Sequence, residues 1–470
     1  MLKPKAIAIL ILLGSVVYSS CVTQKYQEPG LAVGGQLFRD TLVTDSFTMG
    51  TLKYTQLFTD TVLQNLITEG IAENLDLKTA MQRMNIAKEN VQQSKANFFP
   101  SIDGNARAIS SKQSIAALNL PPDFIGTFPL TVTTFQASIS ASWEADIWGK
   151  LKSTKKMAIA NFLQSDAARR VIQTQLVADI AGYYFQLLSL DEQLSITELT
   201  LINRKKEMET MKVLKDAAIV TGAAVVQSEA NRYAAEVLIP DIKRLIRETE
   251  NALSVLLAKA PGAIKRSTMA AQNFSEDLRT GVPSQLLQNR PDIQRASFAF
   301  RAAFENTNVA KTYFYPQLTI TAEGGLSTLK IQNLFDRSVF YNIIGGLTQP
   351  IFNKRLNKTR LNIAKAQQQE AYYGYQQTLL QAGAEVSNAL YAYKASMEKQ
   401  NSRTLQIKAL EKSVDFTRQL LQYSSATNYT DVLTSEQSLL SAQLNSVNDR
   451  LQQMQAIVDL YKALGGGWQE

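Results

Sequence analysis

Four segments of the chain alternate apolar and polar residues in the way that β-strands do. They cover 101–112 and 131–144 in the first half, and 317–328 and 338–349 in the second half. Strands of about ten or more residues exceed the usual globular length and suit tilted membrane strands. A half-exposed antiparallel sheet with its polar face in water predicts the same alternation, so the pattern alone leaves both interpretations open.

Long helices are predicted to fill most of the remaining chain. No proline occurs in 150–217 or in 354–423, and about 70 helical residues would extend about 100 Å. In the first long helix and in the segment 440–461, apolar residues recur in alternating steps of three and four, the spacing of a coiled-coil seam. The two seams are Leu176, Ile180, Tyr183, Leu187, Leu190 and Leu194, and Leu440, Leu444, Val447, Leu451, Met454, Val458 and Tyr461.

Two short polar breaks interrupt these helical patterns. Thr221-Gly222 follows the first long helix, and Thr427-Asn428 follows the second. Turn-forming residues between two helical patterns favour a reversal of the chain. We therefore expect two helical hairpins, with return helices over 223–259 and 430–464.

The second half of the chain repeats the first. The segment 96–102 is echoed by 311–318, aligned on Pro100 and Pro316, and 146–150 is echoed by 350–354. A third echo links 227–230 with 434–437. The three separations are 216, 204 and 207 residues, and the order is kept. Three echoes in the same order indicate a duplication of about 200 residues rather than a short solenoid repeat.

The N-terminus is typical of a secretory signal peptide. Lys3 and Lys5 precede an apolar run over 6–13, which is too short to span a bilayer, and small residues precede Cys21. Small residues directly before the only cysteine resemble a bacterial lipoprotein signal, so Cys21 is predicted to become the lipidated first residue. A plain signal peptide with an incidental thiol is the alternative.

Composition excludes most familiar enzyme classes. The 470 residues contain no histidine and one cysteine, which removes histidine-dependent catalysis, His-ligated metal sites and thiolate zinc sites. No P-loop motif occurs. The net charge of +8 comes without long charge runs, so nucleic-acid binding is not predicted. We expect no enzyme, no metal site and no cofactor.

The number of predicted strands limits how the chain could cross a membrane. After residue 20 no apolar run approaches 18 residues, so a membrane crossing would have to be made by strands. Four strands cannot close a barrel, and an open edge in lipid leaves backbone groups unpaired. Membrane-spanning strands would therefore have to be pooled between copies, with eight strands from two chains or twelve from three.

The order of helix, aromatic-Pro, strand pair, long helix and hairpin resembles the TolC family of outer-membrane efflux proteins, and most closely its lipidated OprM-like (NodT-type) branch. The resemblance covers residues 60–465. The matching motifs are Asn74-Leu-Asp-Leu77, Phe98-Phe-Pro100, Trp143-Glu-Ala-Asp-Ile-Trp-Gly149, Asn289-Arg-Pro-Asp-Ile293 and Tyr315-Pro316.

This resemblance implies an α+β fold, mainly long α-helices forming a coiled-coil α-barrel, with four strands contributed to a trimeric twelve-stranded transmembrane β-barrel. It implies a homotrimer anchored in outer-membrane lipid, with a periplasmic helical tunnel. The tunnel would dock a periplasmic adaptor (membrane fusion) protein bound to an inner-membrane transporter of the resistance-nodulation-division type. The chain would then be a passive exit duct for drugs or other small solutes.

The expected domain organisation follows from the same resemblance. A lipoprotein signal peptide over 1–20 precedes an N-terminal lipidated segment over 21–59. The first repeat covers 60–265, and a linker over 266–289 leads to the second repeat over 290–465.

The resemblance also implies a gate at the second hairpin tip. Asp431 matches an acidic position that faces the lumen in TolC-like channels, where threefold symmetry makes it a ring of carboxylates. TolC has a second aspartate three residues further on, where this chain has Thr434. The alternative is that Asp431 stabilises the N-terminus of the return helix. Thr221, Gly222, Thr427 and Asn428 are the candidate adaptor contacts, and simple turn formation is their alternative role.

The polar faces of the strands carry the remaining candidates. Asp103, Arg107, Glu144 and Glu323 are predicted to face the lumen of the barrel. Trp143 and Tyr341 are predicted to face lipid in an aromatic girdle, or to pack in a strand core. A periplasmic coiled-coil scaffold lipoprotein that tethers envelope components is the competing function, but it leaves the four alternating segments without a role.

Overall fold

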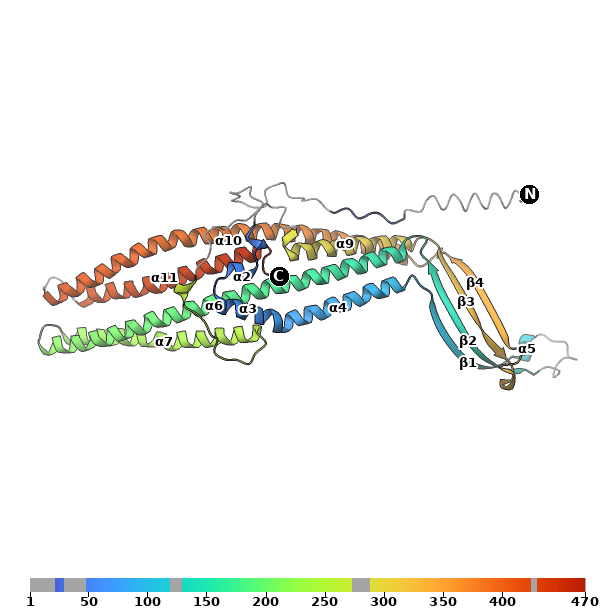
Figure 1. Cartoon of the computed structure of the whole chain (residues 1–470), viewed down its shortest axis with the longest axis horizontal. Coiled ribbons are helices and arrows are strands. Elements are labelled where there is room, and N and C mark those ends of the chain that lie inside the picture. Colours follow the sequence, from blue (N-terminus) through green and yellow to red (C-terminus); the bar gives the residue numbers. More distant parts are fainter. Residues whose placement is uncertain (1–21, 29–47, 119–128, 273–287, 424–428, 470) are drawn as a thin grey trace. The chain divides into compact units, whose positions relative to one another are not determined.

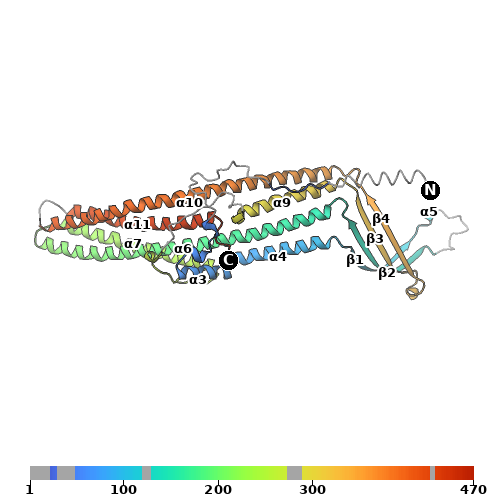
Figure 2. The same ribbon diagram turned by 45° about the horizontal axis from the view of Figure 1, so that its top comes forward.

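The computed structural model describes residues 22–28, 48–118, 129–272, 288–423 and 429–469, and it combines long helices with one four-stranded sheet (Figures 1 and 2). The chain divides into two compact units. The first contains 1–28, 85–163 and 297–373, and the second contains 29–84, 164–296 and 374–470. Each unit therefore takes segments from both halves of the sequence.

The sheet belongs to the first unit, and its strands lie side by side in chain order (Figure 1). It consists of β1 (Ser101–Lys112), β2 (Thr131–Ala145), β3 (Gln317–Thr328) and β4 (Val339–Thr348), all antiparallel to their neighbours. These bounds lie within one residue of the ranges expected from the alternation. β1 and β4 form the two edges, and no partner strand covers either edge among the described residues.

Each hairpin of the sheet follows a helix of 22 residues. α4 (Leu75–Ala96) leads into β1, and α9 (Pro291–Thr312) leads into β3. Pro100 and Pro316 stand directly before the strands, where their missing N–H groups and fixed φ stop the helices from continuing. The short helices α5 (Ile115–Leu118) and η4 (Ile331–Asn333) lie in the strand connections.

The two long helices are close in length to the sequence expectation. α6 (Lys150–Asp216) has 67 residues and α10 (Leu356–Tyr423) has 68. Each turns back into a return helix of 35 residues, α7 (Gly222–Leu256) and α11 (Tyr429–Ala463), which runs beside it in both ribbon views (Figures 1 and 2). The Asp146 carboxylate fixes the start of α6, because it accepts hydrogen bonds from Leu151 N and Lys152 N at 2.8 and 2.9 Å.

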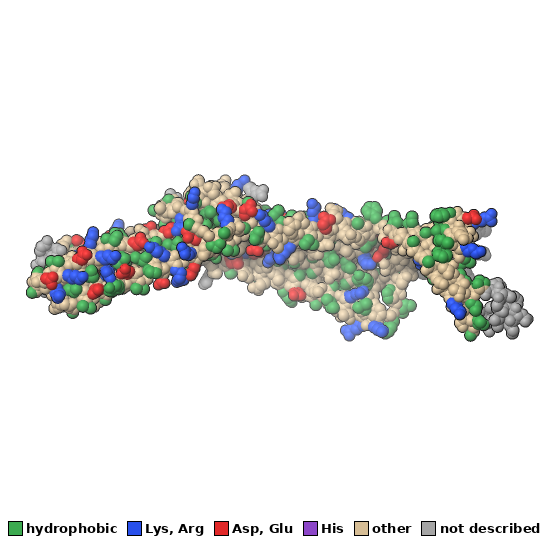
Figure 3. All heavy atoms as spheres, turned by 90° about the horizontal axis from the view of Figure 1, so that it is seen from below, with side chains coloured by type: hydrophobic (Ala, Val, Ile, Leu, Met, Phe, Trp, Pro, Cys, Tyr) green, Lys and Arg blue, Asp and Glu red, His purple; other side chains and the backbone are tan. Residues whose placement is uncertain are grey.

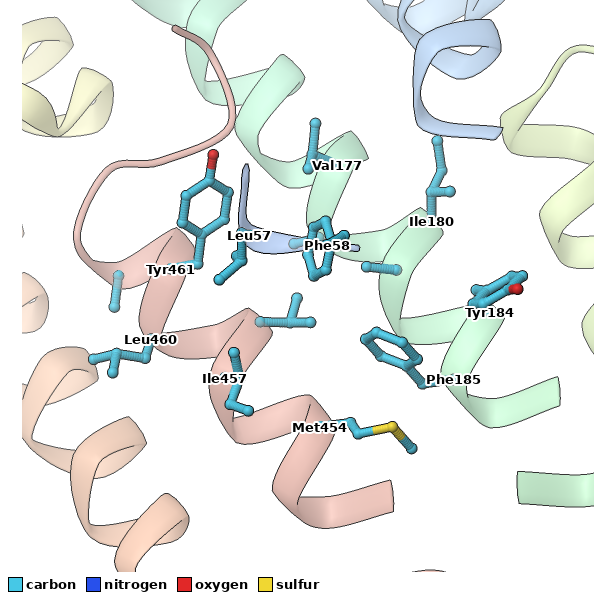
Figure 4. Close-up of a cluster of buried hydrophobic side chains, with 14 of the residues drawn as sticks. Leu57, Phe58, Val177, Ile180, Tyr184, Phe185, Met454, Ile457, Leu460 and Tyr461 are labelled. Carbon is cyan, nitrogen blue, oxygen red and sulfur yellow. The ribbon is translucent and has the colours of Figure 1, made fainter. Parts of the chain in front are cut away.

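The core of the second unit forms where α6 and α11 approach each other around Phe58 (Figure 4). Phe58 is 2% exposed, and its ring meets Phe185 and Tyr461 edge-on, with centroids 6.1 and 6.3 Å apart. Full burial of one such side chain stabilises the fold by about 1.5–3 kcal/mol. The short elements that complete this unit are η1 (Met49–Thr51), α2 (Tyr54–Leu57), α3 (Thr61–Glu73) and η3 (Met269–Ala271).

One position of the expected seam on α6 is wrong. Tyr183 is 39% exposed, whereas its neighbours Tyr184 and Phe185 are fully buried. The reason is that α6 is covered on more than one side at this level, so a single 3.5-residue stripe does not describe its buried face. The Tyr184 hydroxyl uses this position to donate to Asp60 Oδ2 at 2.6 Å.

The surface of the helical hairpins is strongly charged. In the view of Figure 3, Lys, Arg, Asp and Glu side chains are interspersed over the hairpin end on the left. None of the described helices combines the length and apolar content needed to span a bilayer.

Candidate functional site: hairpin tips, sheet face and strand–helix junction

The tip of the first hairpin is a tight turn between α6 and α7. Ala218 adopts the left-handed conformation with φ +59°, and Ile219 N donates back to Leu214 O at 2.8 Å. Thr221 is the N-cap of α7, but only its carbonyl oxygen serves the cap, by accepting from Ala224 N at 3.1 Å. Thr221 and Gly222 are both exposed. The Thr221 side chain therefore makes no capping hydrogen bond in this turn.

The second tip contains the predicted gate residues. Thr427 and Asn428 lie outside the described residues, so the structure gives no account of them. Asp431 and Thr434 are exposed in the first turns of α11, three residues apart and so on one helix face. The Thr434 hydroxyl donates to Thr430 O at 2.9 Å. Asp431 also stands where a carboxylate favours a helix N-terminus.

Apolar side chains join the two hairpins just behind their tips. Met211 from α6 packs with Tyr429 and Val432 from α11, and all three are at most 6% exposed. Beside them lies a groove of about 500 Å³, here called the tip groove. It is lined by Ile219, Val220, Thr221, Ala223, Ala224, Gln227, Leu421, Tyr429, Thr430 and Leu433. Neither Tyr429 nor Met211 was predicted from the sequence, although Tyr429 and Val432 have the three-residue spacing of a buried helix face.

A polar cluster lies next to these apolar contacts. Arg418 on α10 donates to Glu436 on α11, with its Nε 2.9 Å from Oε1. Burial and the adjacent Glu436 carboxylate raise the pKa of Glu207 on α6 to about 7. Burial and the Glu207 carboxylate also raise the pKa of Tyr429. The carboxyl groups of Glu207 and Glu436 therefore lie next to each other in a partly buried environment, and Arg418 is hydrogen-bonded to Glu436.

A second contact ties α7 into the same region. Arg204 on α6 donates to the carbonyl oxygen of Asn231 on α7 at 2.7 Å, and both residues are buried. Gln437 on α11 donates to Asn231 Oδ1 at 3.4 Å. Side chains from all four hairpin helices thus meet behind the tips. No spacing rule in the sequence brings these residues together, because they come from segments up to 233 residues apart.

The polar face of the sheet brings together two of the predicted lumen residues. Arg107 on β1 donates through Nε and Nη2 to Gln136 Oε1 at 2.9 and 2.7 Å, and lies 4.0 Å from the Glu323 carboxylate on β3. Gln136 and Ser138 on β2 both donate to Glu323 Oε1, at 3.0 and 2.8 Å. One continuous polar network therefore crosses three strands.

The other two predicted lumen residues stand apart from this network. Glu144, near the end of β2, forms an ion pair with Lys150 at 3.0 Å. Asp103 is exposed on β1, opposite Ser140 on β2. Of the two aromatic residues predicted to face lipid, Tyr341 is 82% exposed, and Trp143 is 38% exposed and donates to the Phe98 carbonyl oxygen at 2.9 Å.

The segment Val22–Glu28 is fastened along α9. The backbone of Gln24 exchanges two hydrogen bonds with the Asn308 side chain, at 3.1 and 3.0 Å. The Tyr26 ring packs on Phe300 and Phe304, with centroids 5.9 and 5.5 Å away. Thr23 approaches Gly149, the last residue before α6. Cys21 itself lies outside the described residues.

A family model described as outer membrane efflux protein matches residues 66–259 and 282–466. Over 342 residues the chain is 32% identical to a pyoverdine export outer membrane protein, OpmQ, of Pseudomonas putida, covering 72% of each chain. It is 28% identical over 403 residues to the cation efflux system protein CusC of Escherichia coli, covering 84% of each.

Solved structures share the fold at lower identity. The outer-membrane channel OprN matches with a TM-score of 0.88 at 21% identity, over 96% of this chain and 100% of that one. The open state of the MtrE outer membrane channel of Neisseria gonorrhoeae matches with a TM-score of 0.84 at 24% identity, over 95% and 98% of the two chains.

Proposed function

The chain belongs to the outer membrane efflux protein family, and from this premise we propose that it is the exit duct of a tripartite efflux pump. The observation that carries the proposal is the pairing of a four-stranded sheet, open at both edges, with two helical hairpins of very long helices. In the proposal the strands lie in the outer membrane and the hairpins extend into the periplasm. The scaffold alternative explains the hairpins only.

Three copies of the chain would complete the duct. A sheet with two uncovered edges cannot stay open in lipid, because each unpaired backbone group costs several kcal/mol there. Eight strands enclose an interior filled by side chains, whereas twelve leave an opening. A homotrimer with a twelve-stranded barrel is therefore the smallest assembly that conducts. Asp103, Arg107, Glu144 and Glu323 would face its lumen.

The hairpin tips would meet the rest of the pump. Thr221 and Gly222 are exposed beside the tip groove, and Thr427 and Asn428 directly precede α11 in the sequence. We assign these four residues to contact with a periplasmic adaptor, itself bound to an inner-membrane transporter of the resistance-nodulation-division type. The named relatives export pyoverdine and cations, which supports small solutes as the cargo class.

The same tips would hold the gate. In a homotrimer, Asp431 and Thr434 would each occur three times around the pore. Three Asp431 carboxylates in a narrow passage repel one another and attract cations. Thr434 adds no second charge, so the cation-binding ring would rest on Asp431 alone.

Lipid on Cys21 would anchor the chain in the outer membrane. The residues after Cys21 are held along α9, and Thr23 lies against Gly149 at the end of β2. Since the strands end there, this position coincides with the periplasmic surface of the membrane in the proposed arrangement. Acyl chains on Cys21 would then reach the adjacent leaflet.

Reconstitution into liposomes tests the proposal. Purified full-length protein would be weighed by native mass spectrometry in detergent and then inserted into vesicles containing a trapped small dye. A trimeric mass together with dye release supports the exit duct. A monomer that leaves the dye trapped contradicts it and favours the scaffold.

A further inference from the structure

We infer that Phe352 of one copy packs on Phe99 and Pro100 of the next copy, and that β4 pairs there with β1 so that Gly345 faces Ala106. The inference rests on the proposed homotrimer. It goes further by naming the surface between copies and its register. The occupant of this surface is a second copy of the same chain.

The two repeats of the sheet unit correspond residue by residue. α4 and α9 differ by 216 positions at both ends, and so do β1 and β3. The pair Glu89-Asn90 recurs as Glu305-Asn306 at the same separation. At the junction between the second strand and the long helix, Asp146-Ile-Trp148 recurs as Pro350-Ile-Phe352, 204 positions later.

Both hairpins are also tied to the end of the helix that precedes them. Trp143 Nε1 donates to the Phe98 carbonyl oxygen at 2.9 Å in the first repeat. In the second repeat, Gln349 Nε2 donates to the Phe314 carbonyl oxygen at 3.1 Å. The acceptors Phe98 and Phe314 correspond at 216 positions, whereas the donors differ by 206, so the acceptor side of the contact follows the repeat.

One contact between the repeats has no counterpart within the chain. Trp148 of the first repeat reaches the second repeat, where its Nε1 donates to the Pro316 carbonyl oxygen at 2.7 Å. Its ring lies on Tyr315, with centroids 5.0 Å apart. The equivalent contact would join Phe352 to Phe99 and Pro100, which flank opposite edges of the sheet.

Both aromatic side chains of the missing contact are uncovered. Phe352 is 83% exposed and Phe99 is 74% exposed. Ile351, beside Phe352, is 98% exposed. Large apolar side chains with so little cover mark an interaction surface when they cluster. They lie at the ends of β1 and β4, two long edge strands whose backbone groups favour pairing with another chain.

A charged residue shows the same asymmetry. Glu305 on α9 is 1% exposed and lies 3.5 Å from Lys156 Nζ on α6. Its repeat counterpart, Glu89 on α4, is exposed. Lys156 corresponds to Arg360, since the Ile159-Ala160 pair that follows it recurs as Ile363-Ala364. Arg360 of one copy would therefore cover Glu89 of the next copy.

The repeat also predicts the strand register between copies. Within the chain, Trp143 faces Ile320, Ala141 faces Ala322 and Ile139 faces Gly324. The β2 residue of each pair corresponds to the β4 residue 204 positions later, and the β3 residue corresponds to the β1 residue 216 positions earlier. The equivalent pairs between copies are Leu347 with Gly104, Gly345 with Ala106, and Ile343 with Ala108. Every pair brings the apolar faces of β4 and β1 together. A slip of one residue would oppose apolar and polar faces.

Barrel geometry is compatible with this register. Gly104 pairs with Ile139, which pairs in turn with Gly324. Gly324 pairs with Tyr341, and the inferred register places Tyr341 opposite Ser110 of the next copy. The register therefore shifts by six residues, about 20 Å, across the four strands of one copy, about 19 Å, which corresponds to a strand tilt of about 46°. A shift of four residues would give about 35° and a shift of eight about 54°, so the usual tilt of about 35–45° excludes eight, and the repeat selects six.

Cysteine cross-linking tests the register. Gly345→Cys would be combined in turn with Gly104→Cys, Ala106→Cys, Ala108→Cys and Ser110→Cys. A Cβ at Gly345 meets no atom within 4 Å, so the substitution fits. Directly opposed residues lie about 4.5–5.5 Å apart at Cα, within disulfide range, whereas diagonal neighbours lie about 7–8 Å apart.

The inference predicts that the Ala106→Cys combination gives the highest yield of disulfide-linked dimers and trimers on a non-reducing gel. A maximum at any of the other three positions overturns the register. Absence of cross-links at all four positions in protein of trimeric native mass overturns the inferred register while leaving the proposed function standing. A monomeric native mass overturns both.

A double-mutant cycle tests the aromatic contact separately. Phe352→Ala and Phe99→Ala should each lower the temperature at which trimers dissociate in detergent, and the double variant should lower it no further than the stronger single variant. Phe335→Ala is the matched control, because Phe335 is 88% exposed between β3 and β4, away from this junction. Additive effects of the two substitutions, or an equal effect of the control, would overturn the contact.

Discussion

The Glu207 carboxyl group on α6 lies against the Glu436 carboxyl group on α11, so the two hairpins meet at a pair of like charges. Arg418 is bound to Glu436, and the Tyr429 side chain is buried beside the pair. A contact of this kind depends on whether one of the two carboxyl groups carries a proton.

The contact between the hairpins should therefore weaken as the pH rises. The pKa of Glu207 is about 7, above the ordinary value for glutamate, 4.5. Its stabilising contribution is thus complete below the unfolded pKa and is lost as the pH rises through about 7. The loss is at most about 3 kcal/mol. Hydrogen exchange of α6 and α11 near the tips, corrected for intrinsic rates, should be faster at pH 8 than at pH 5.

Glu207→Gln should remove this pH dependence, because a neutral amide hydrogen-bonds to Glu436 at either pH. Glu209→Gln is the matched control, since Glu209 is an exposed carboxylate on the same helix. It should leave the dependence unchanged. Equal protection of the wild-type tips at pH 5 and pH 8 would contradict the interpretation.

Thr434→Asp should strengthen cation binding at the proposed gate. The substitution places a second carboxylate three residues after Asp431 on the same helix face. In a trimer this adds three negative charges to the ring, and we expect divalent cations to block the current at about tenfold lower concentration, about 1.4 kcal/mol. A variant that is blocked at the wild-type concentration would show that position 434 does not face the pore.

Cys21→Ser should remove the proposed lipid without releasing the protein from the membrane. The mature chain should lose the mass of its acyl groups in mass spectrometry. It should remain in the outer-membrane fraction, because the strands hold it there. A change of mass no larger than the exchange of sulfur for oxygen would contradict lipidation and favour the plain signal peptide, and a protein freed into the periplasm would show that the lipid is the main anchor.

Phe58→Ala should destabilise the second unit. The ring fills the space between Phe185 and Tyr461, and loss of a buried phenylalanine costs about 3–5 kcal/mol. Chemical denaturation monitored by circular dichroism measures the change. Phe416→Ala is the control, since Phe416 is 60% exposed and should cost less than about 0.5 kcal/mol. Equal effects would contradict the assigned core.

Local patterns in the sequence were sufficient to predict the positions of the strands and of the helical hairpins. Alternation located β1 and β3 to the residue, because apolar residues or glycine occupy most of one face of each strand. The seam on α11 was also correct from Val447 to Tyr461. On α6 the same rule selected Tyr183 instead of Tyr184, because a helix covered on several sides has no single seam.

The candidate site was less accessible to sequence reasoning. Thr221 and Asp431 could be named because turn residues and helix starts have local signatures. The cluster of Glu207, Arg418 and Glu436 could not, since only the folded hairpins bring these side chains together. The repeat in the sequence already related Phe352 to Trp148, so a contact of Phe352 equivalent to that of Trp148 could have been sought from the sequence.

Single-channel recording in planar bilayers tests the central claim most directly. Wild-type protein would be compared with Asp431→Ala and with Asp216→Ala, which removes an exposed carboxylate at the end of α6. The account predicts discrete current steps for all three proteins, with a larger or more frequently open state in Asp431→Ala alone. Absence of conductance from all three, together with a monomeric native mass, would contradict the account.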